Sequence, residues 1–168
     1  MLRKTNKKGD NTMKKTEDNE KAGIDRRLHF RFPTITIVKE VVIFVTHPRT
    51  KKKIVLPAIM YNLSAGGIAI VTFEKVPIGA IITLNLNLDG INLQNVTGKV
   101  VRVEGRNVTF LIAIDFTNLT KELKKKITMI ANDADICETR IMLGEKHACK
   151  KKCTYYSLCT NPVKKKYA

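Results

Sequence analysis

The chain has 168 residues, of which 43% are hydrophobic, so it is long enough for one packed domain and a tail or two. Lys and Arg number 31 against 15 Asp and Glu, and this net charge of +16 favours anionic partners such as nucleotides, nucleic acid or an acidic membrane face. No apolar run approaches the roughly 18 residues of a membrane-spanning helix, and the N-terminus lacks the apolar segment of a secretory signal. We therefore expect a cytoplasmic protein with no membrane span.

Composition divides the chain into three parts. Residues 1–22 contain hardly any large apolar side chains, which predicts a disordered basic N-terminal arm. Residues 23–134 hold nearly all the β-branched residues and form the expected globular part. Residues 135–168 form a Cys-rich, Lys-rich tail. The net charges of these parts are +3, +8 and +5, so no single stripe accounts for the charge.

The middle of the chain is predicted to form short strands separated by turns, because Val, Ile, Thr and Phe dominate between polar turn segments. We predict strands at 34–46, 54–63, 68–72, 81–88, 91–103 and 108–116. The polar segments 47–53, 64–67, 74–79, 89–90 and 104–107 would connect them. Asp89-Gly90 is a strong hairpin signal. Many short antiparallel strands of this kind predict an all-β fold, a small barrel or a sandwich.

One helix follows the strands. Thr120 is a suitable N-cap, and residues 121–135 continue with helical spacing. The apolar positions expected on one face are Leu123, Ile127 and Ile130, with Met129 near them. We expect this face to pack on the barrel and the lysines at 121 and 124–126 to lie mostly in solvent.

An arginine cluster, "RRLHFR" at residues 26–31, stands where the arm meets the first strand. The guanidinium groups of Arg26, Arg27 and Arg31 can each donate two parallel hydrogen bonds to a phosphate or to a guanine edge, and they can stack on flat bases. The alternative interpretation is a basic surface turn. His29, inside the cluster, would line the ligand site or pack.

A second motif, "NLSAGG" at residues 62–67, follows about thirty residues later. Asn62 can present an acceptor to a base edge, and Ser64 can offer a hydroxyl to a phosphate or to the turn. Gly66 and Gly67 permit positive φ angles and the close approach of a ligand to the backbone. An ordinary β-turn is the alternative interpretation.

Taken together, RxxxR before the first strand and NxSxxG in an all-β domain resemble the PilZ family. "GKVVR" at 98–102 and "IAIDF" at 112–116 also look like later strands of that family. The resemblance covers roughly residues 23–134. It implies a six-stranded antiparallel β-barrel followed by an α-helix, and many members of the family bind the bacterial second messenger cyclic di-GMP.

The resemblance also implies roles for individual residues. Arg27 and Arg31 would contact phosphates and guanine edges, and Arg26 would add charge or stack on a base. Asn62 would accept a hydrogen bond from a guanine N–H, and Ser64 would hold the turn and the ligand. Gly67, beside Gly66, would permit close approach of the ligand. We expect a bacterial cyclic di-GMP receptor whose arginine segment becomes ordered on binding and signals to a downstream protein. The alternatives are a PilZ-type adaptor that binds no nucleotide and, less favoured, a basic nucleic-acid-binding barrel. No catalytic constellation appears, so we expect no enzyme.

The tail holds the four cysteines of the chain: Cys137, Cys149, Cys153 and Cys159. Four thiolates can complete a tetrahedral zinc site or hold an iron–sulfur cluster, and a metal would help a short tail to fold. The spacing differs from the paired CxxC of zinc ribbons. We predict a zinc or iron–sulfur site, with free thiols and disulfide or redox chemistry as alternatives.

Overall fold

The computed structural model describes residues 29, 31–33, 39–146, 148–149 and 152–159. The strands within these ranges are β1 (Arg31–Pro33), β2 (Glu40–Thr46), β3 (Lys53–Ser64), β4 (Gly67–Thr72), β5 (Ile81–Leu88), β6 (Ile91–Arg106) and β7 (Thr109–Phe116). They are followed by helix α1 (Lys121–Met142) and a short 3-10 helix, η1 (Tyr156–Leu158).

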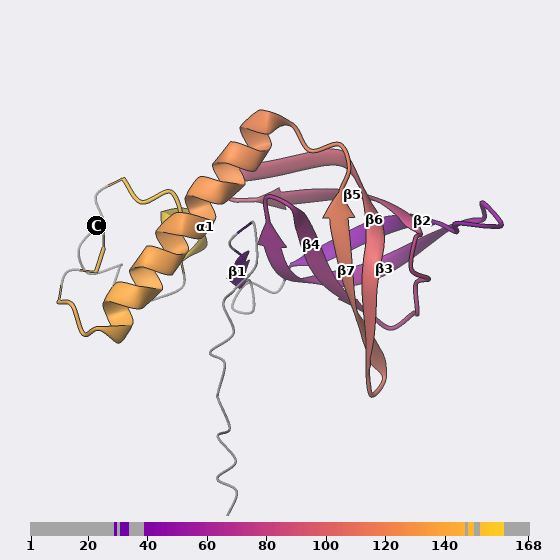
Figure 1. The fold of residues 1–168 in the computed structure, drawn as a ribbon, viewed down its shortest axis with the longest axis horizontal. Helices are drawn as coiled ribbons and strands as arrows, with labels where there is room; N and C mark the ends of the chain where they lie inside the picture. Colours follow the sequence, from indigo (N-terminus) through magenta and orange to yellow (C-terminus); the bar gives the residue numbers. More distant parts are fainter. Residues whose placement is uncertain (1–28, 30, 34–38, 147, 150–151, 160–168) are drawn as a thin grey trace, which may run out of the picture.

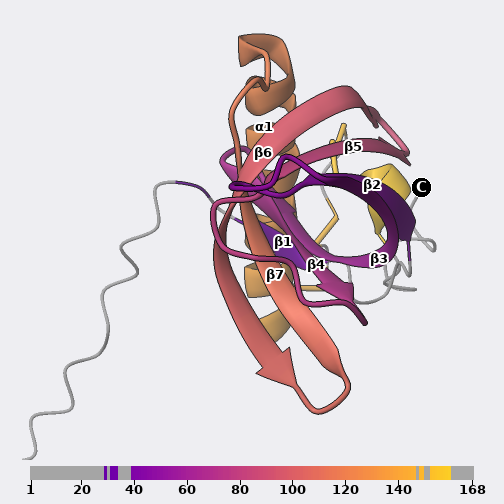
Figure 2. The same ribbon diagram turned by 90° about the vertical axis from the view of Figure 1, so that its right-hand side faces the viewer.

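Six of the strands close into an antiparallel barrel. The order is β3-β2-β5-β6-β7-β4, and β4 pairs again with β3, so the ring is complete (Figures 1 and 2). The short strand β1 pairs with the last residues of β3, beyond the part of β3 that pairs with β2. The six-stranded barrel predicted from the sequence is therefore confirmed. Closure also satisfies the backbone groups that open sheet edges would leave unpaired.

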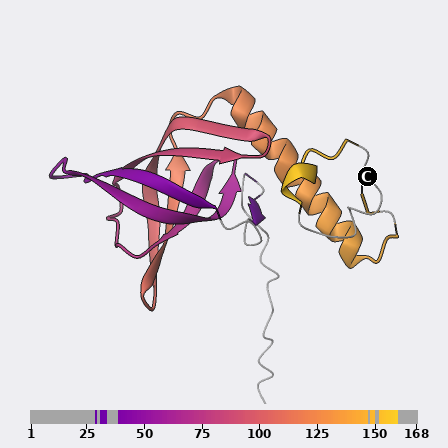
Figure 3. The same ribbon diagram turned by 180° about the vertical axis from the view of Figure 1, so that it is seen from behind.

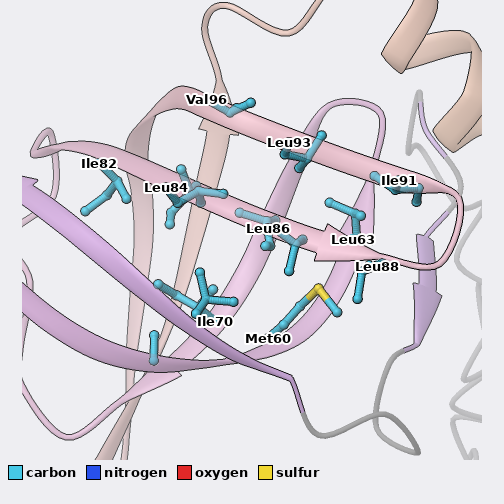
Figure 4. Close-up of a cluster of buried hydrophobic side chains, with 14 of the residues drawn as sticks. Met60, Leu63, Ile70, Ile82, Leu84, Leu86, Leu88, Ile91, Leu93 and Val96 are labelled. Carbon is cyan, nitrogen blue, oxygen red and sulfur yellow. The ribbon is translucent and has the colours of Figure 1, made fainter.

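The barrel interior is filled by aliphatic side chains from alternating strand positions. In β5, Ile82, Leu84, Leu86 and Leu88 are buried, as the alternation in the sequence predicts (Figure 4). Met60, Leu63 and Ile70 approach them from β3 and β4. Burial of such side chains is the main favourable term in folding, at roughly 25 cal/mol per Å² of apolar surface.

Register shifts interrupt the strand pairing at three places, and two of them lie in the part of the barrel wall formed by β3, β4, β7 and β6. In β3 the pairing with β4 shifts between Met60 and Asn62, and in β6 the pairing with β7 shifts between Val100 and Arg102. An extra residue at a bulge places two successive side chains on the outside where one would otherwise stand. Tyr61 and Asn62 are both accordingly half-exposed, between buried neighbours.

The hairpin after β6 differs from the prediction. Residues 104–106, which were expected in a turn, continue β6, and the turn consists of Asn107 and Val108 alone. Asn107 adopts a φ of 49°, a conformation that Asn accepts more readily than most residues. At the other end of the barrel, the strand predicted from residue 34 begins at Glu40 as β2, and residues 34–38 lie outside the described residues.

Helix α1 begins as predicted, because the Thr120 side chain accepts a hydrogen bond of 3.3 Å from the backbone N–H of Leu123. Ile127 and Ile130 are buried against the barrel, but Met129 is 48% exposed, so its placement near the buried face was wrong. The helix also runs to Met142, seven residues beyond the predicted end at 135. No described helix has the length and apolar character needed to cross a membrane.

The longer helix provides a surface on which residues 152–159 lie (Figure 3). The Asp133 carboxylate accepts hydrogen bonds from the backbone N–H of Thr154 at 2.7 Å and from its hydroxyl at 2.8 Å. Tyr155 and Leu158 are buried in the same apolar cluster as Ile127 and Ile130. The first residues of the predicted tail therefore belong to α1, and residues 152–159 pack back onto the helix and the core.

Candidate functional site

A pocket of about 530 Å³ lies on the outer wall of the barrel, where β3, β4, β7 and β6 stand side by side. Its floor is a row of four residues in register across these strands: Asn62, Ala69, Ala113 and Arg102. The two alanines in the middle of this row have short side chains, so the barrel surface is recessed there between the longer side chains of Asn62 and Arg102. The volume lies within the range of small-molecule sites, roughly 300–1,000 Å³.

The pocket brings together the two motifs that lie about thirty residues apart in the sequence. Pairing between β1 and β3 places Arg31 directly opposite Ser64 and Pro33 opposite Asn62. Arg31, Asn62 and Ser64 all line the pocket. His29 lines it as well, as expected. Arg26 and Arg27 lie outside the described residues, so their predicted contacts remain predictions.

Ser64 holds the turn at the pocket edge, as the sequence indicated. Its hydroxyl accepts a hydrogen bond from the backbone N–H of Gly67 and donates one to the Gly67 carbonyl, each at 3.2 Å. Ser64 is itself almost fully buried, with 6% of its surface exposed. The two bonds close the loop between β3 and β4 at the rim of the pocket.

The space beside the two glycines of the second motif is occupied by neighbouring residues. Neither Gly66 nor Gly67 has a positive φ, so the turn does not use the backbone freedom that glycine permits, and the predicted close approach of a ligand stays a prediction. A Cβ on Gly67 would instead collide with the backbone carbonyl of Ile114 in β7, and a Cβ on Gly66 would lie 2.6 Å from the His29 ring. Gly67 therefore has no room for a side chain beside β7, whereas a side chain at Gly66 would have to displace the His29 ring.

The sequence interpretation missed five polar residues that line the pocket: Tyr61, Arg102, Glu104, Arg106 and Asp115. Tyr61 and Arg102 lie at the two bulges, which strand alternation cannot reveal. The guanidinium of Arg106 lies over the Tyr61 ring, 5.3 Å from its centre, a cation–π contact that joins β6 to β3 across the pocket. A signal was present in "VRVEGR", because charges at every second position mark the outer face of a strand.

The charges around the pocket favour an anion. Arg31, Arg102 and Arg106 stand against Glu104 and Asp115 among the described lining residues. Arg102 and Glu104 form an ion pair of 3.2 Å, but both side chains are well exposed, so the pair contributes little to stability and can rearrange around a ligand. The described pocket therefore offers arginine donors at its wall and rim.

Residues 25–132, more than half of the chain, match the family described as PilZ domain. The chain belongs to the PilZ family. This finding confirms the resemblance drawn from the arginine and glycine motifs, and the matched range ends inside α1, so the PilZ domain comprises the barrel and the first part of the helix.

Three solved structures are similar to this PilZ domain, each with 17% sequence identity. YcgR from Escherichia coli in complex with c-di-GMP has a TM-score of 0.49, with 71% of this chain and 50% of that chain covered. The Bacillus subtilis inhibitor of motility MotI/DgrA has a TM-score of 0.46, with coverage of 73% and 54%. The PilZ domain with c-di-GMP of E. coli YcgR has a TM-score of 0.45, with coverage of 71% and 98%. The chain thus spans about half the length of YcgR and MotI. No curated protein matches it significantly.

The predicted metal site beyond the PilZ domain is not supported. Among the described residues, which include all four cysteines, no three side chains of His, Cys, Asp or Glu are placed to hold a metal ion. Cys137 is buried in the part of α1 that continues beyond the predicted end at residue 135. Cys153 and Cys159 pack against the apolar core. No disulfide joins any of the four to another described residue, and those that contact the core act there as small apolar side chains.

Proposed function

We propose that the pocket binds cyclic di-GMP and that the chain is a receptor for this nucleotide. The observation that carries the proposal is the pairing of β1 with β3, which sets Arg31 of RxxxR opposite Ser64 of NxSxxG at the rim of one pocket. PilZ relatives that bind this nucleotide use both motifs. The similar PilZ domain of Escherichia coli YcgR has been solved with c-di-GMP, the same ligand.

The chemistry of the pocket suits the two parts of the ligand. Each phosphodiester of cyclic di-GMP carries a negative charge, which an arginine fork can bind through two charge-assisted hydrogen bonds. Each guanine presents a flat face and a polar edge. The Tyr61–Arg106 pair offers a stacking surface, and the half-exposed Asn62 amide offers an acceptor for a guanine N–H.

Ligand binding would also recruit the arginines that precede β1. In this proposal Arg26 and Arg27 close over the nucleotide bound at Arg31, and the segment becomes ordered as it does so. Ordering costs about 1–2 kcal/mol for each backbone residue, and each hydrogen bond to a charged group returns about 1.5–3 kcal/mol. The rearranged segment would then change the affinity of the protein for a downstream partner. Hydrogen exchange over residues 23–31, with and without ligand, measures this ordering.

Calorimetric titration with cyclic di-GMP tests the binding step. The unmodified chain should bind with micromolar or tighter affinity, and Arg31→Ala should weaken binding by about tenfold or more, because it removes a charged pair of donors. Arg49→Ala is the matched control, since Arg49 is an exposed arginine that does not line the pocket. Equal effects of both variants would show that net charge alone attracts the nucleotide. Absence of binding by the folded chain would favour the adaptor that binds no nucleotide.

A further inference from the structure

The end of the barrel that faces away from α1 carries a set of residues that do not line the pocket. It consists of residues 47–53 of the β2–β3 hairpin, residues 73–80 between β4 and β5, and Lys99 of β6. We call this set the basic tip. Thr46 at the end of β2 pairs with Ile81 at the start of β5, so both loops leave the barrel at the same end (Figures 1 and 2). A Cβ on Gly79 would lie 4.0 Å from side-chain carbons of both Lys99 and Pro48.

The tip has a strong excess of positive charge. Its cations, all exposed, are Arg49, Lys51, Lys52, Lys53, Lys75 and Lys99. Its single acidic residue is Glu74, so the net charge of the tip is +6 − 1 = +5. Between described residues, ion pairs join Arg102 to Glu104 and Arg140 to Glu145. The tip cations therefore have no carboxylate partner in the described part of the chain.

Two large apolar side chains project beside these cations. Phe73 is 72% exposed and Ile78 is 64% exposed. The loop that carries them is anchored on both sides, because Val76 and Ala80 are fully buried. The Thr72 hydroxyl donates a 2.6 Å hydrogen bond to the Glu74 carbonyl, which fixes the start of the loop.

The hairpin next to this loop is held in a defined turn. The backbone N–H groups of Arg49 and Thr50 both donate to His47 Nδ1 at 3.2 Å. The backbone N–H of His47 donates to the backbone carbonyl of Lys52 at 2.9 Å. Because both loops are fixed, their cations and apolar side chains are presented together at one end of a rigid barrel.

We propose that the basic tip docks the protein onto an anionic lipid membrane. Peripheral membrane binding combines buried apolar area with attraction between basic residues and anionic headgroups, and the tip supplies both. Lysine stems also lie along apolar surface while their ammonium groups reach the headgroups. A second copy of the chain would meet the same positive charge and be repelled. Nucleic acid would use the cations but would gain little from Ile78, which has no face for stacking. The proposal does not rest on nucleotide binding.

Flotation with lipid vesicles tests the proposal on the full chain. The protein should bind vesicles of phosphatidylglycerol and phosphatidylcholine in equal parts and should dissociate from them at high salt. It should not bind vesicles of phosphatidylcholine alone. Each lysine near such a surface contributes about a fivefold change in partitioning, so the triple change Lys51→Gln, Lys52→Gln and Lys53→Gln should lower binding about a hundredfold. The same triple change at residues 124–126 of α1 removes equal charge from exposed lysines elsewhere and should lower it far less.

A second pair of variants separates the apolar contribution from charge. Phe73→Ser with Ile78→Ser should reduce binding about tenfold without altering net charge. Val108→Ser with Met142→Ser, two exposed apolar residues outside the tip, should leave it unchanged. Thermal unfolding confirms that each variant folds. The proposal is overturned if anionic vesicles are not bound, if the α1 triple variant loses as much as the tip variant, or if the tip selects an oligonucleotide or an acidic protein over anionic vesicles.

Discussion

The two glycines of the NxSxxG motif should respond very differently to alanine, because different atoms occupy the space beside them. At Gly67 the new Cβ would meet the backbone carbonyl of Ile114, which β4–β7 pairing holds in place. At Gly66 it would meet the edge of the His29 ring at 2.6 Å, and a side chain can rotate away. Gly67→Ala should therefore strain the barrel, whereas Gly66→Ala should mainly displace His29 from the pocket.

The size of the effect follows from the cost of forcing atoms into a packed site, typically about 1–3 kcal/mol and more where backbone must move. We expect Gly67→Ala to lower the free energy of unfolding by about 2–3 kcal/mol, a fall of roughly 4–12 °C in Tm for a domain of this size. Gly66→Ala should cost about 1 kcal/mol or less, within the range of ordinary substitutions.

Urea unfolding, followed by circular dichroism, measures both changes. The midpoint should shift for Gly67→Ala with an unchanged m-value, which shows that stability rather than compactness has changed. His29→Ala provides the internal check: it should remove the cost of Gly66→Ala and leave that of Gly67→Ala in place. Equal costs for the two glycine variants, or rescue of Gly67→Ala by the His29 change, would refute the reasoning.

Three further predictions concern the pocket, the helix and the tail. Tyr61→Leu should weaken cyclic di-GMP binding about tenfold in calorimetry by removing a stacking face, while unfolding stability changes little. Thr120→Ala should lower the free energy of unfolding by about 1 kcal/mol in a urea titration, because the first turn of α1 loses its side-chain cap. Asp133→Ala should loosen the tail, since two hydrogen bonds to Thr154 are lost. Limited proteolysis should then cut near residues 146–152 faster.

Each of these three predictions has a control that separates it from a general disturbance. Tyr156→Leu removes an exposed tyrosine of the tail and should leave nucleotide affinity unchanged. Thr120→Ser keeps a capping hydroxyl and should restore the helix. Thr154→Val removes one of the two hydrogen bonds to Asp133 and should loosen the tail less than Asp133→Ala. If a control variant had a larger effect than the variant it is paired with, the role inferred for that contact would be contradicted.

Local patterns in the sequence predicted those parts of the fold that depend on neighbouring residues. Alternation from Ile82 to Leu88 identified the buried face of β5, and Thr120 marked the start of α1 correctly. The end of the helix was predicted too early, at residue 135, because no large apolar side chains at helical spacing were recognised beyond it. Ala134 and Cys137 in fact continue the buried face, and small side chains give a weak periodic signal.

The pocket was predicted only in part, because its shape depends on pairings between distant strands. Arg31 and Ser64 were both identified, but β1 itself was not, and it is the pairing of β1 that joins them. Tyr61 and Arg102 lie at bulges, which shift register in a way that no local pattern reveals. The metal site predicted from the cysteines is not supported in the described part of the chain, where Cys153 and Cys159 pack against the apolar core.

The most direct test of the account is an NMR titration of the labelled chain with cyclic di-GMP, which locates the ligand as well as detecting it. We expect shifts of backbone amide signals at residues 64–69 and 102–106, on both sides of the pocket floor, and unchanged signals in the hairpin turn at 47–52. Unchanged spectra at saturating nucleotide, or shifts confined to positions outside the pocket, would contradict the claim that this pocket is the receptor site.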